Sequence, residues 1–169
     1  AAMTQIEYAE PIERPLTVFE KVWQQDPDTH LFHSEDHGVM AVADAFPKLP
    51  LQLVVAPKHG SDMEQAAFED LPVFTRLVLH TVADAMQAKI RRYCTLGQMP
   101  VRHIEGRGVP NHPHIVLFAG EKGQGKDLYT GQLLGQTAVR STMQSLRLLH
   151  NERAELNAQL DQLARAFDR

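Results

Sequence analysis

The sequence lacks the features that mark several large classes of protein. It has one cysteine, Cys94, which excludes an intramolecular disulfide. Neither a charged-then-apolar leader nor a long uncharged apolar run is found near its start, so we expect no membrane partner. It also has no excess of basic residues: the formal net charge is -4 and the pI is about 6.1, which disfavours DNA or RNA as a partner. We expect a cytoplasmic protein.

The residues that are present fit a single globular domain. The chain has 169 residues, of which 43% are hydrophobic and 22% charged, so its core needs no disulfide or metal. Residues 1–15 are expected to form an arm, in which Ala1 and Ala2 look like residues left by cloning. Residues 16–125 are expected to form the domain, and residues 126–169 a C-terminal helical extension.

Hydrophobic periodicity predicts an α+β fold. Apolar runs bounded by turn residues indicate antiparallel strands at 31–33, 39–43, 51–56, 101–104 and 115–119. Between the third and fourth strands, apolar residues at helical spacing from Leu71 to Ile90 predict an amphipathic helix. A shorter helix is expected within residues 16–25. The expected architecture is an antiparallel sheet with one packed amphipathic helix and a long C-terminal helix.

The C-terminal part, from Gly131 to Phe167, is long enough for one or two helices. It contains no proline, and its apolar residues recur mostly at intervals of three and four. Arg153 falls within the apolar stripe, so a regular coiled coil is not indicated, and a helix packed on its own sheet remains an alternative. Because so long an apolar edge on a small domain usually needs a partner, we expect a homodimer.

A pair of histidines, His112 and His114, begins the last expected strand. Alternate side chains of a strand project to one face, so both imidazoles are expected to point the same way. A neutral imidazole can attack phosphorus with one nitrogen if the other donates a hydrogen bond that fixes the tautomer. Backbone N–H groups at Gly106 and Gly108, with the guanidinium of Arg107, are candidates to meet the charge of a phosphate. Two such rings can make a nucleophile and its orienting partner.

Several stretches, in the same order along residues 32–120, resemble the histidine-triad (HIT) family of nucleotide hydrolases and transferases. Residues 35–47 are similar to the family's first hairpin and Asp-x-x-Pro turn. Residues 50–59 are similar to its Pro-x-His-x-Leu-Val-Ile-Pro-Lys-x-His strand, with Gln52 in place of the first histidine. Residues 112–119, His-Pro-His-Ile-Val-Leu-Phe-Ala, are similar to its His-φ-His-φ-His-φ-φ signature, with Val116 at the third place. The His-Pro-His core looks closest to the related hexose-1-phosphate uridylyltransferases.

The resemblance implies a role for each matched residue. His114 takes the central place, where the family's histidine attacks the α-phosphorus of a nucleotide and forms a covalent nucleotidyl-histidine, and His112 stands beside it. Asp44 stands where the family binds the ribose hydroxyls. The other residues expected at the nucleotide are Gln52, Arg107 and Gly108. The implied activity is hydrolysis or transfer at the α-phosphate of a nucleotide conjugate or dinucleoside polyphosphate, without metal or cofactor.

Two alternatives to this assignment stay open. Val116 cannot protonate a leaving group or hold a phosphate oxygen, and losing such a donor typically costs about a hundredfold or more in rate. The alternative function is therefore a catalytically weak or inactive nucleotide-binding or interaction module. In an alternative register, His112 is central, His114 third and Pro110 first, which leaves Leu117 where the pattern has a small residue.

Two unrelated kinds of site also compete. Residues 120–126 spell the Gly-x-x-x-x-Gly-Lys of a P-loop, but Asp127 replaces its magnesium-binding hydroxyl residue and little chain follows to build a parallel sheet. His103, His112 and His114 together are candidate metal ligands, but no cysteine pair, HExxH motif or clear carboxylate ligand accompanies them. Both interpretations are disfavoured on the sequence.

Overall fold

The computed structural model describes residues 14–44, 52–62, 66–93, 101–106, 112–119 and 143–168. Its elements, in chain order, are α1 (Val18–Trp23), a 3₁₀ turn (Pro27–Thr29), β1 (Phe32–Ser34), β2 (Val39–Ala43), β3 (Leu53–Pro57), a second 3₁₀ turn (Phe68–Asp70), α2 (Val73–Tyr93), β4 (Val101–Gly106), β5 (His114–Ala119) and α4 (His150–Phe167). The α+β class predicted from the sequence is confirmed. The expected strands, the short helix within 16–25 and the helix from Leu71 to Ile90 are found within a few residues of their predicted positions, and α4 occupies the second half of the segment expected to hold the C-terminal helices.

The five strands of the described chain form one sheet in the order β1-β2-β3-β5-β4, with every pair antiparallel. At the β1–β2 hairpin Gly38 has a φ of 62°, a left-handed conformation that glycine adopts without steric cost. Because β5 is antiparallel to both of its neighbours, it cannot be the parallel strand that precedes a P-loop. The P-loop interpretation of residues 120–126 therefore fails, although these residues themselves lie outside the described part.

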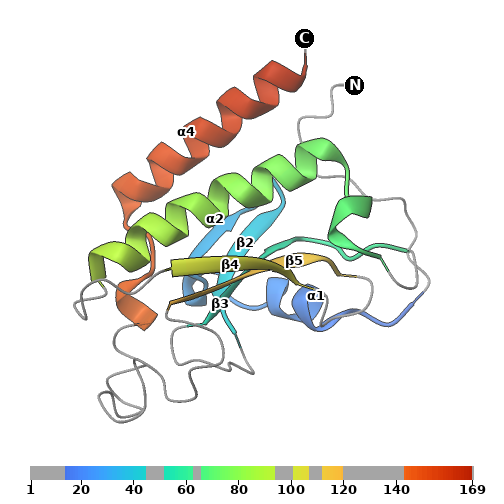
Figure 1. Ribbon diagram of the computed structural model, residues 1–169, viewed down its shortest axis with the longest axis horizontal. Coiled ribbons are helices and arrows are strands. Elements are labelled where there is room, and N and C mark those ends of the chain that lie inside the picture. The colour runs from blue at the N-terminus through green and yellow to red at the C-terminus, as the bar shows by residue number, and fades with distance from the viewer. Residues whose placement is uncertain are drawn as a thin grey trace.

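The sheet is covered on both faces, by α2 and α4 on one side and by α1 on the other (Figure 1). The α2 face holds the larger core, because one apolar stripe of α2 meets the alternate apolar residues of the strands. The buried residues of that stripe are Phe74, Val78, Leu79, Val82, Ala83, Met86 and Ile90. None of the described helices is both long and apolar enough to cross a membrane.

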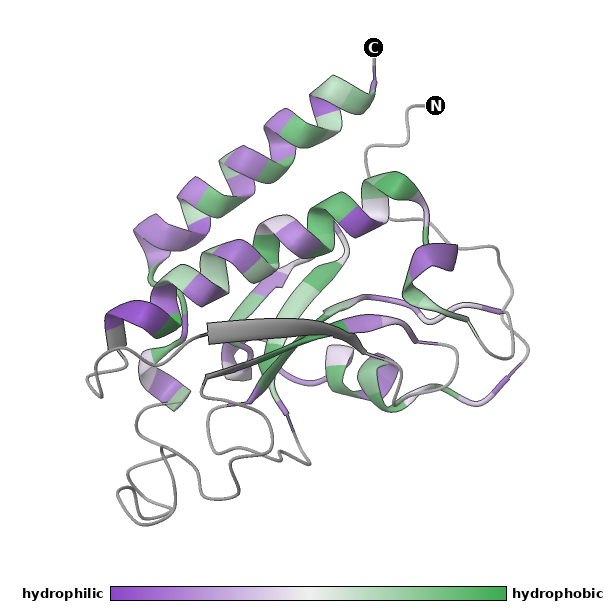
Figure 2. Ribbon diagram, viewed as in Figure 1, coloured by the Kyte–Doolittle hydropathy of each residue, from purple (hydrophilic) through white to green (hydrophobic). Residues whose placement is uncertain are grey.

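The C-terminal helix α4 packs against α2 of its own chain and runs antiparallel to it (Figure 1). At one end the rings of Phe74 and Phe167 lie 5.1 Å apart, and at the other Lys89 and Arg92 both pair with Glu152. Hydrophobic and hydrophilic residues alternate along α4 (Figure 2). Its buried apolar residues are Leu156, Leu160 and Ala164, which belong to the main core.

This packing confirms one of the two alternatives for the apolar C-terminal stripe, a helix packed on its own sheet. The helix covers its own sheet and also hydrogen-bonds to the sheet edge, where Ser34 Oγ lies 3.0 Å from Asn157 Oδ1 and His37 Nε2 lies 2.8 Å from Asp161 Oδ1. The stripe no longer requires a second copy, because the chain itself removes it from water. A homodimer stays a prediction that has lost its main argument.

The opposite face of the sheet carries a smaller apolar cluster beneath α1. Its buried members are Trp23, Met40, Val42, Val54 and Ala56, and the partly buried Phe19, Val22 and Val116 pack against them. The helix begins at Thr17, whose side chain caps it, as the Thr-x-x-Glu pattern of a capping box allows. The histidine pair lies on this face.

Candidate functional site

His114 begins β5 and His112 lies two residues before it, and both side chains project towards α1. The ring of Phe19 meets each of them edge-on, with centroid distances of 5.1 Å to His112 and 4.7 Å to His114. His112 is fully buried and His114 retains 4% of its surface. The two imidazoles thus share one face of the sheet, as strand alternation predicts.

The imidazole of His114 is held in one tautomer by the chain that precedes it. Its Nδ1 lies 2.9 Å from the carbonyl oxygen of His112, and because a carbonyl only accepts, Nδ1 carries the hydrogen. In the neutral ring Nε2 then bears a lone pair, and this atom has no hydrogen-bond partner within the described residues. Burial lowers the pKa of His114, outweighing the hydrogen bond to His112 and the charge of Asp44. His114 is therefore neutral near pH 7.

The imidazole of His112 uses both of its nitrogens inside the protein. Nε2 lies 2.8 Å from the carbonyl oxygen of Pro57, and Nδ1 lies 2.6 Å from the hydroxyl of Thr17. Burial lowers the pKa of His112 to about 4, although the carbonyl of Pro57 and the charge of Glu20 act in the opposite direction. His112 is therefore a neutral ring that holds its surroundings in place and has no nitrogen left for a substrate.

The same occupancy argues against the metal interpretation. A metal ligand needs a free nitrogen lone pair, and His112 offers its Nδ1 lone pair to Thr17. The side chain of His103 lies outside the described part. Elsewhere in the described residues, no three His, Cys, Asp or Glu side chains are grouped to hold a metal ion.

Asp44 and Gln52 are brought together across the β2–β3 connection. Asp44 follows β2 directly and Gln52 precedes β3, and the amide nitrogen of Asp44 donates to the carbonyl of Gln52 at 3.1 Å. The Gln52 side chain donates to Asp44 Oδ2 at 2.7 Å, which orients the carboxylate. Asp44 also raises the pKa of His114 by its charge, so it lies within electrostatic reach of the imidazole. Arg107 and Gly108 lie outside the described residues.

Val116 is the next side chain of β5 on the face of His114. It is partly exposed and packs on the apolar cluster beneath α1, opposite Val54 of β3. The third place of the motif therefore presents methyl groups and no hydrogen-bonding atom.

The sequence analysis missed the contribution of α1 and of the residue before it. Of residues 1–15, which were expected to be an arm, the structure describes Arg14 and Pro15, and Arg14 makes two hydrogen bonds to the Glu20 carboxylate, at 2.7 and 3.0 Å. Thr17 reaches His112, which is 95 residues further along the chain. The capping box Thr17-x-x-Glu20 signals where a helix starts, but no local pattern shows which distant side chain its hydroxyl meets.

The buried state of His112 predicts that the protein loses stability in mild acid. The unfolded chain binds a proton at this residue near its ordinary pKa of 6.5, whereas the folded chain does so only at about 4. The contribution of His112 to the free energy of unfolding is therefore fully present above pH 6.5. It declines by about 3 kcal/mol in total as the pH falls towards 4. Urea unfolding at about pH 7, 5.5 and 4.5 measures the decline.

The variant His112→Gln serves as the comparison, because it removes the titrating group. Its free energy of unfolding should depend less steeply on pH over this range than that of the unchanged protein. Glu20 does not interfere, because its pKa is lowered to about 2 and its contribution is lost only as the pH falls below about 4.5. Equal slopes in both proteins would show that His112 is not buried in the neutral form.

The fold is shared with histidine-triad proteins of known structure. A zinc-bound histidine triad family protein from Mycobacterium smegmatis matches with a TM-score of 0.55 and 16% identity, over 84% of this chain and 96% of that one. A Hit-like protein from Bartonella henselae, involved in cell-cycle regulation, matches with a TM-score of 0.54 and 14% identity, over 79% of this chain and 98% of that one. No protein-family model and no curated protein matches the sequence. The chain therefore has a HIT-like fold, as the resemblance implied.

Proposed function

We propose that this chain hydrolyses a nucleotide conjugate, or transfers its nucleotidyl group, through a covalent intermediate on His114. The observation that carries the proposal is the hydrogen bond from His114 Nδ1–H to the carbonyl of His112, at 2.9 Å. It leaves the Nε2 lone pair on a ring that burial keeps neutral, and a neutral imidazole nitrogen is what attack on phosphorus needs. The HIT-like fold supports the same proposal.

The contacts of His112 support His114 as the central residue. A nucleophile needs a nitrogen that can leave its protein contacts, and both nitrogens of His112 are engaged at 2.6 and 2.8 Å. His112 instead supplies the carbonyl that fixes its neighbour. The alternative register, with His112 central, would require one of these two hydrogen bonds to break.

The reaction takes two displacements. The Nε2 lone pair forms a bond to the α-phosphorus, and the bond from phosphorus to the leaving group breaks with its electron pair going to that group. Water or another acceptor then attacks the same phosphorus and gives up its proton to solvent, and the N–P bond breaks to restore neutral His114. Val116 has no proton to donate, so the leaving group must take one from solvent or depart without it. Phosphate-type leaving groups meet that requirement better than alkoxides.

Nucleotidylated His114 is the direct test of this function. We would incubate the protein with adenosine phosphoramidate or a dinucleoside polyphosphate, quench it, and map the added adenylyl mass by peptide mass spectrometry. We expect the adduct on His114 and released product in the supernatant. Turnover with an adduct on another residue, or turnover without any adduct under rapid quench, would contradict the proposal.

Asp44 is proposed to bind the ribose hydroxyls, because its carboxylate is oriented by Gln52 and lies near His114. The variant Asp44→Asn keeps the shape and loses the charge, so a charge-assisted hydrogen bond of about 1.5–3 kcal/mol should be lost. We expect KM to rise by roughly tenfold to a hundredfold, with a smaller change in kcat. A 2′-deoxy substrate is the control: if Asp44 contacts that hydroxyl, the substitution should matter much less for it.

One observation favours a second candidate, a HIT-like nucleotide-binding module with weak or no catalysis. Val116 places an apolar side chain where a donor to the leaving group would stand, and it is packed into the cluster beneath α1. Such a module would bind nucleoside monophosphate in a calorimetric titration and give neither adduct nor turnover. The adduct experiment separates the two candidates.

A further inference from the structure

The hydroxyl of Thr17 lies 2.6 Å from Nδ1 of His112, and the direction of this hydrogen bond is fixed by the other side of the ring. Nε2 of His112 faces the carbonyl of Pro57 at 2.8 Å, and a carbonyl cannot donate, so Nε2 carries the hydrogen. Nδ1 of the neutral ring must then accept. Thr17 is therefore the donor, and the two contacts together select one tautomer and one orientation of His112.

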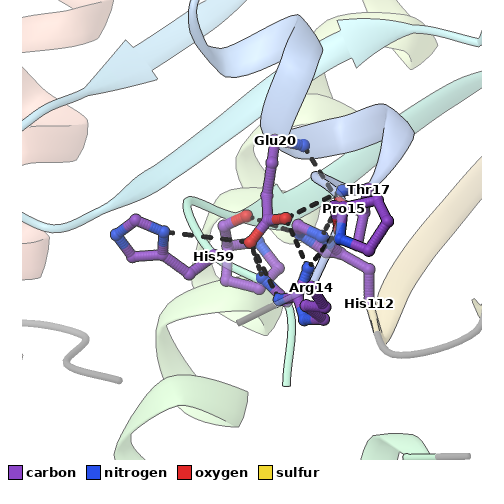
Figure 3. A network of polar contacts seen from close by, with 8 residues as sticks. Arg14, Pro15, Thr17, Glu20, His59 and His112 are labelled. Carbon is purple, nitrogen blue, oxygen red and sulfur yellow. Dashed lines mark hydrogen bonds and ion pairs between the residues drawn. The ribbon is translucent and has the colours of Figure 1, made fainter. Parts of the chain in front are cut away.

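Thr17 is itself held by a network around Glu20 (Figure 3). Its hydroxyl accepts from the Glu20 amide at 3.1 Å, and the Glu20 carboxylate accepts from the Thr17 amide at 2.8 Å. That carboxylate also accepts from the Gly60 amide at 2.8 Å and from two nitrogens of Arg14. Pro57 is the last residue of β3, and Gly60 lies three residues after it. The start of α1, through Glu20, and Nε2 of His112 are therefore both hydrogen-bonded to this one segment.

The chain of contacts ends at the proposed nucleophile. The carbonyl of His112 accepts from Nδ1 of His114, so a shift of the His112 main chain, which its two ring contacts hold in place, displaces the group that sets the tautomer of His114. Phe19 packs edge-on against both rings and leaves them little room to rotate. A chain of hydrogen bonds thus runs from the cap of α1 to His114, through Glu20, Thr17 and His112.

We propose that Thr17 is a positioning residue for His114 and acts through the imidazole and the carbonyl of His112. This inference rests on the proposed role of His114 as nucleophile. Thr17 touches no substrate. It keeps the hydrogen on Nδ1 of His114 and the lone pair on Nε2, so it acts on the chemical step and leaves substrate binding unaffected.

Two variants of Thr17 test its hydroxyl, which both contacts His112 and caps α1. Thr17→Val removes the donor and keeps the shape, while Thr17→Ser keeps the donor. With Thr17→Val we expect kcat to fall by about tenfold or more at nearly constant KM, because a misplaced or wrong-tautomer imidazole weakens the chemical step. Thr17→Ser should restore kcat to within about threefold of the unchanged protein.

Imidazole nitrogen NMR gives a readout that does not depend on turnover. In the unchanged protein His114 should show the Nδ1–H tautomer alone, and in Thr17→Val a second population with hydrogen on Nε2 should appear. Thr17→Asp keeps the helix cap but presents an acceptor to His112, so His112 should take a proton on Nδ1 and titrate well above its value of about 4. This variant carries the test if Thr17→Val does not fold.

The outcomes are distinct for this inference and for the proposed function. An unchanged His114 tautomer in Thr17→Val, or an unchanged His112 titration in Thr17→Asp, overturns the inference. If the unchanged protein shows no turnover and no adduct, the proposed function fails, while the NMR spectra still decide whether Thr17 controls the tautomer of His114. A fall in kcat that Thr17→Ser does not restore would also overturn the inference.

Discussion

Replacing His114 with asparagine is expected to reduce turnover of a dinucleoside polyphosphate by about ten-thousandfold or more and to abolish the nucleotidyl adduct. Removing a catalytic nucleophile has effects of this size, because the remaining site only binds and orients the substrate. Asparagine suits the test because its amide can still donate to the carbonyl of His112, as Nδ1 does at 2.9 Å. The folded structure should therefore persist while the reacting lone pair is gone. Steady-state kinetics and rapid-quench mass spectrometry measure the two effects.

The matched control is His150→Asn, at an exposed histidine that begins α4 on the other side of the sheet. It should turn over within about twofold of the unchanged protein. Binding of nucleoside monophosphate by His114→Asn should change little, because the ribose contact proposed for Asp44 remains. Turnover that survives in His114→Asn would remove this residue from the mechanism and leave the binding module as the better candidate.

Replacing Leu160 with alanine should lower the free energy of unfolding by about 2–5 kcal/mol, the range typical of a fully buried leucine. Leu160 belongs to α4 and is fully buried in the main core of the chain. The loss combines the transfer of apolar surface to water with the cavity that remains. Urea or thermal unfolding measures it, and for a chain of this size the midpoint temperature should fall by several degrees.

The control Leu149→Ala, at a leucine that is 59% exposed just before α4, should change stability by no more than about 0.5 kcal/mol. The dependence of the unfolding midpoint on protein concentration is a second test. If α4 is stabilised within one chain, the midpoint of unfolding should not depend on concentration for either variant. A midpoint that rises with concentration in the unchanged protein and drops to a constant value in Leu160→Ala would instead assign α4 to a homodimer interface.

The arrangement of secondary structure was predictable because local patterns report local structure. The apolar run at residues 39–43 predicted β2 with the bounds that the structure has, and the helical spacing from Leu71 to Ile90 predicted most of α2. The spacing of His112 and His114 fixed their common face for the same reason. The contact that holds the His114 tautomer is also local, since its carbonyl belongs to a residue only two positions earlier.

The other contacts of the site were not predictable, because they join residues that are distant in sequence. Nothing in the sequence near residue 17 or residue 112 shows that Thr17 and His112 meet. Gln52 was recognised as a departure from the motif, but its donation to Asp44 depends on how β2 and β3 pair.

By itself, the sequence determined the order of strands and helices along the chain, the shared face of the two histidines and the apolar character of position 116. Each of these depends on side-chain periodicity along a single element. Only the tertiary structure decided that both nitrogens of His112 are occupied and that α4 covers its own sheet. These features depend on which surfaces meet when the elements pack. The hydrophobic effect is non-directional, so the sequence alone does not show which surface an apolar face will contact.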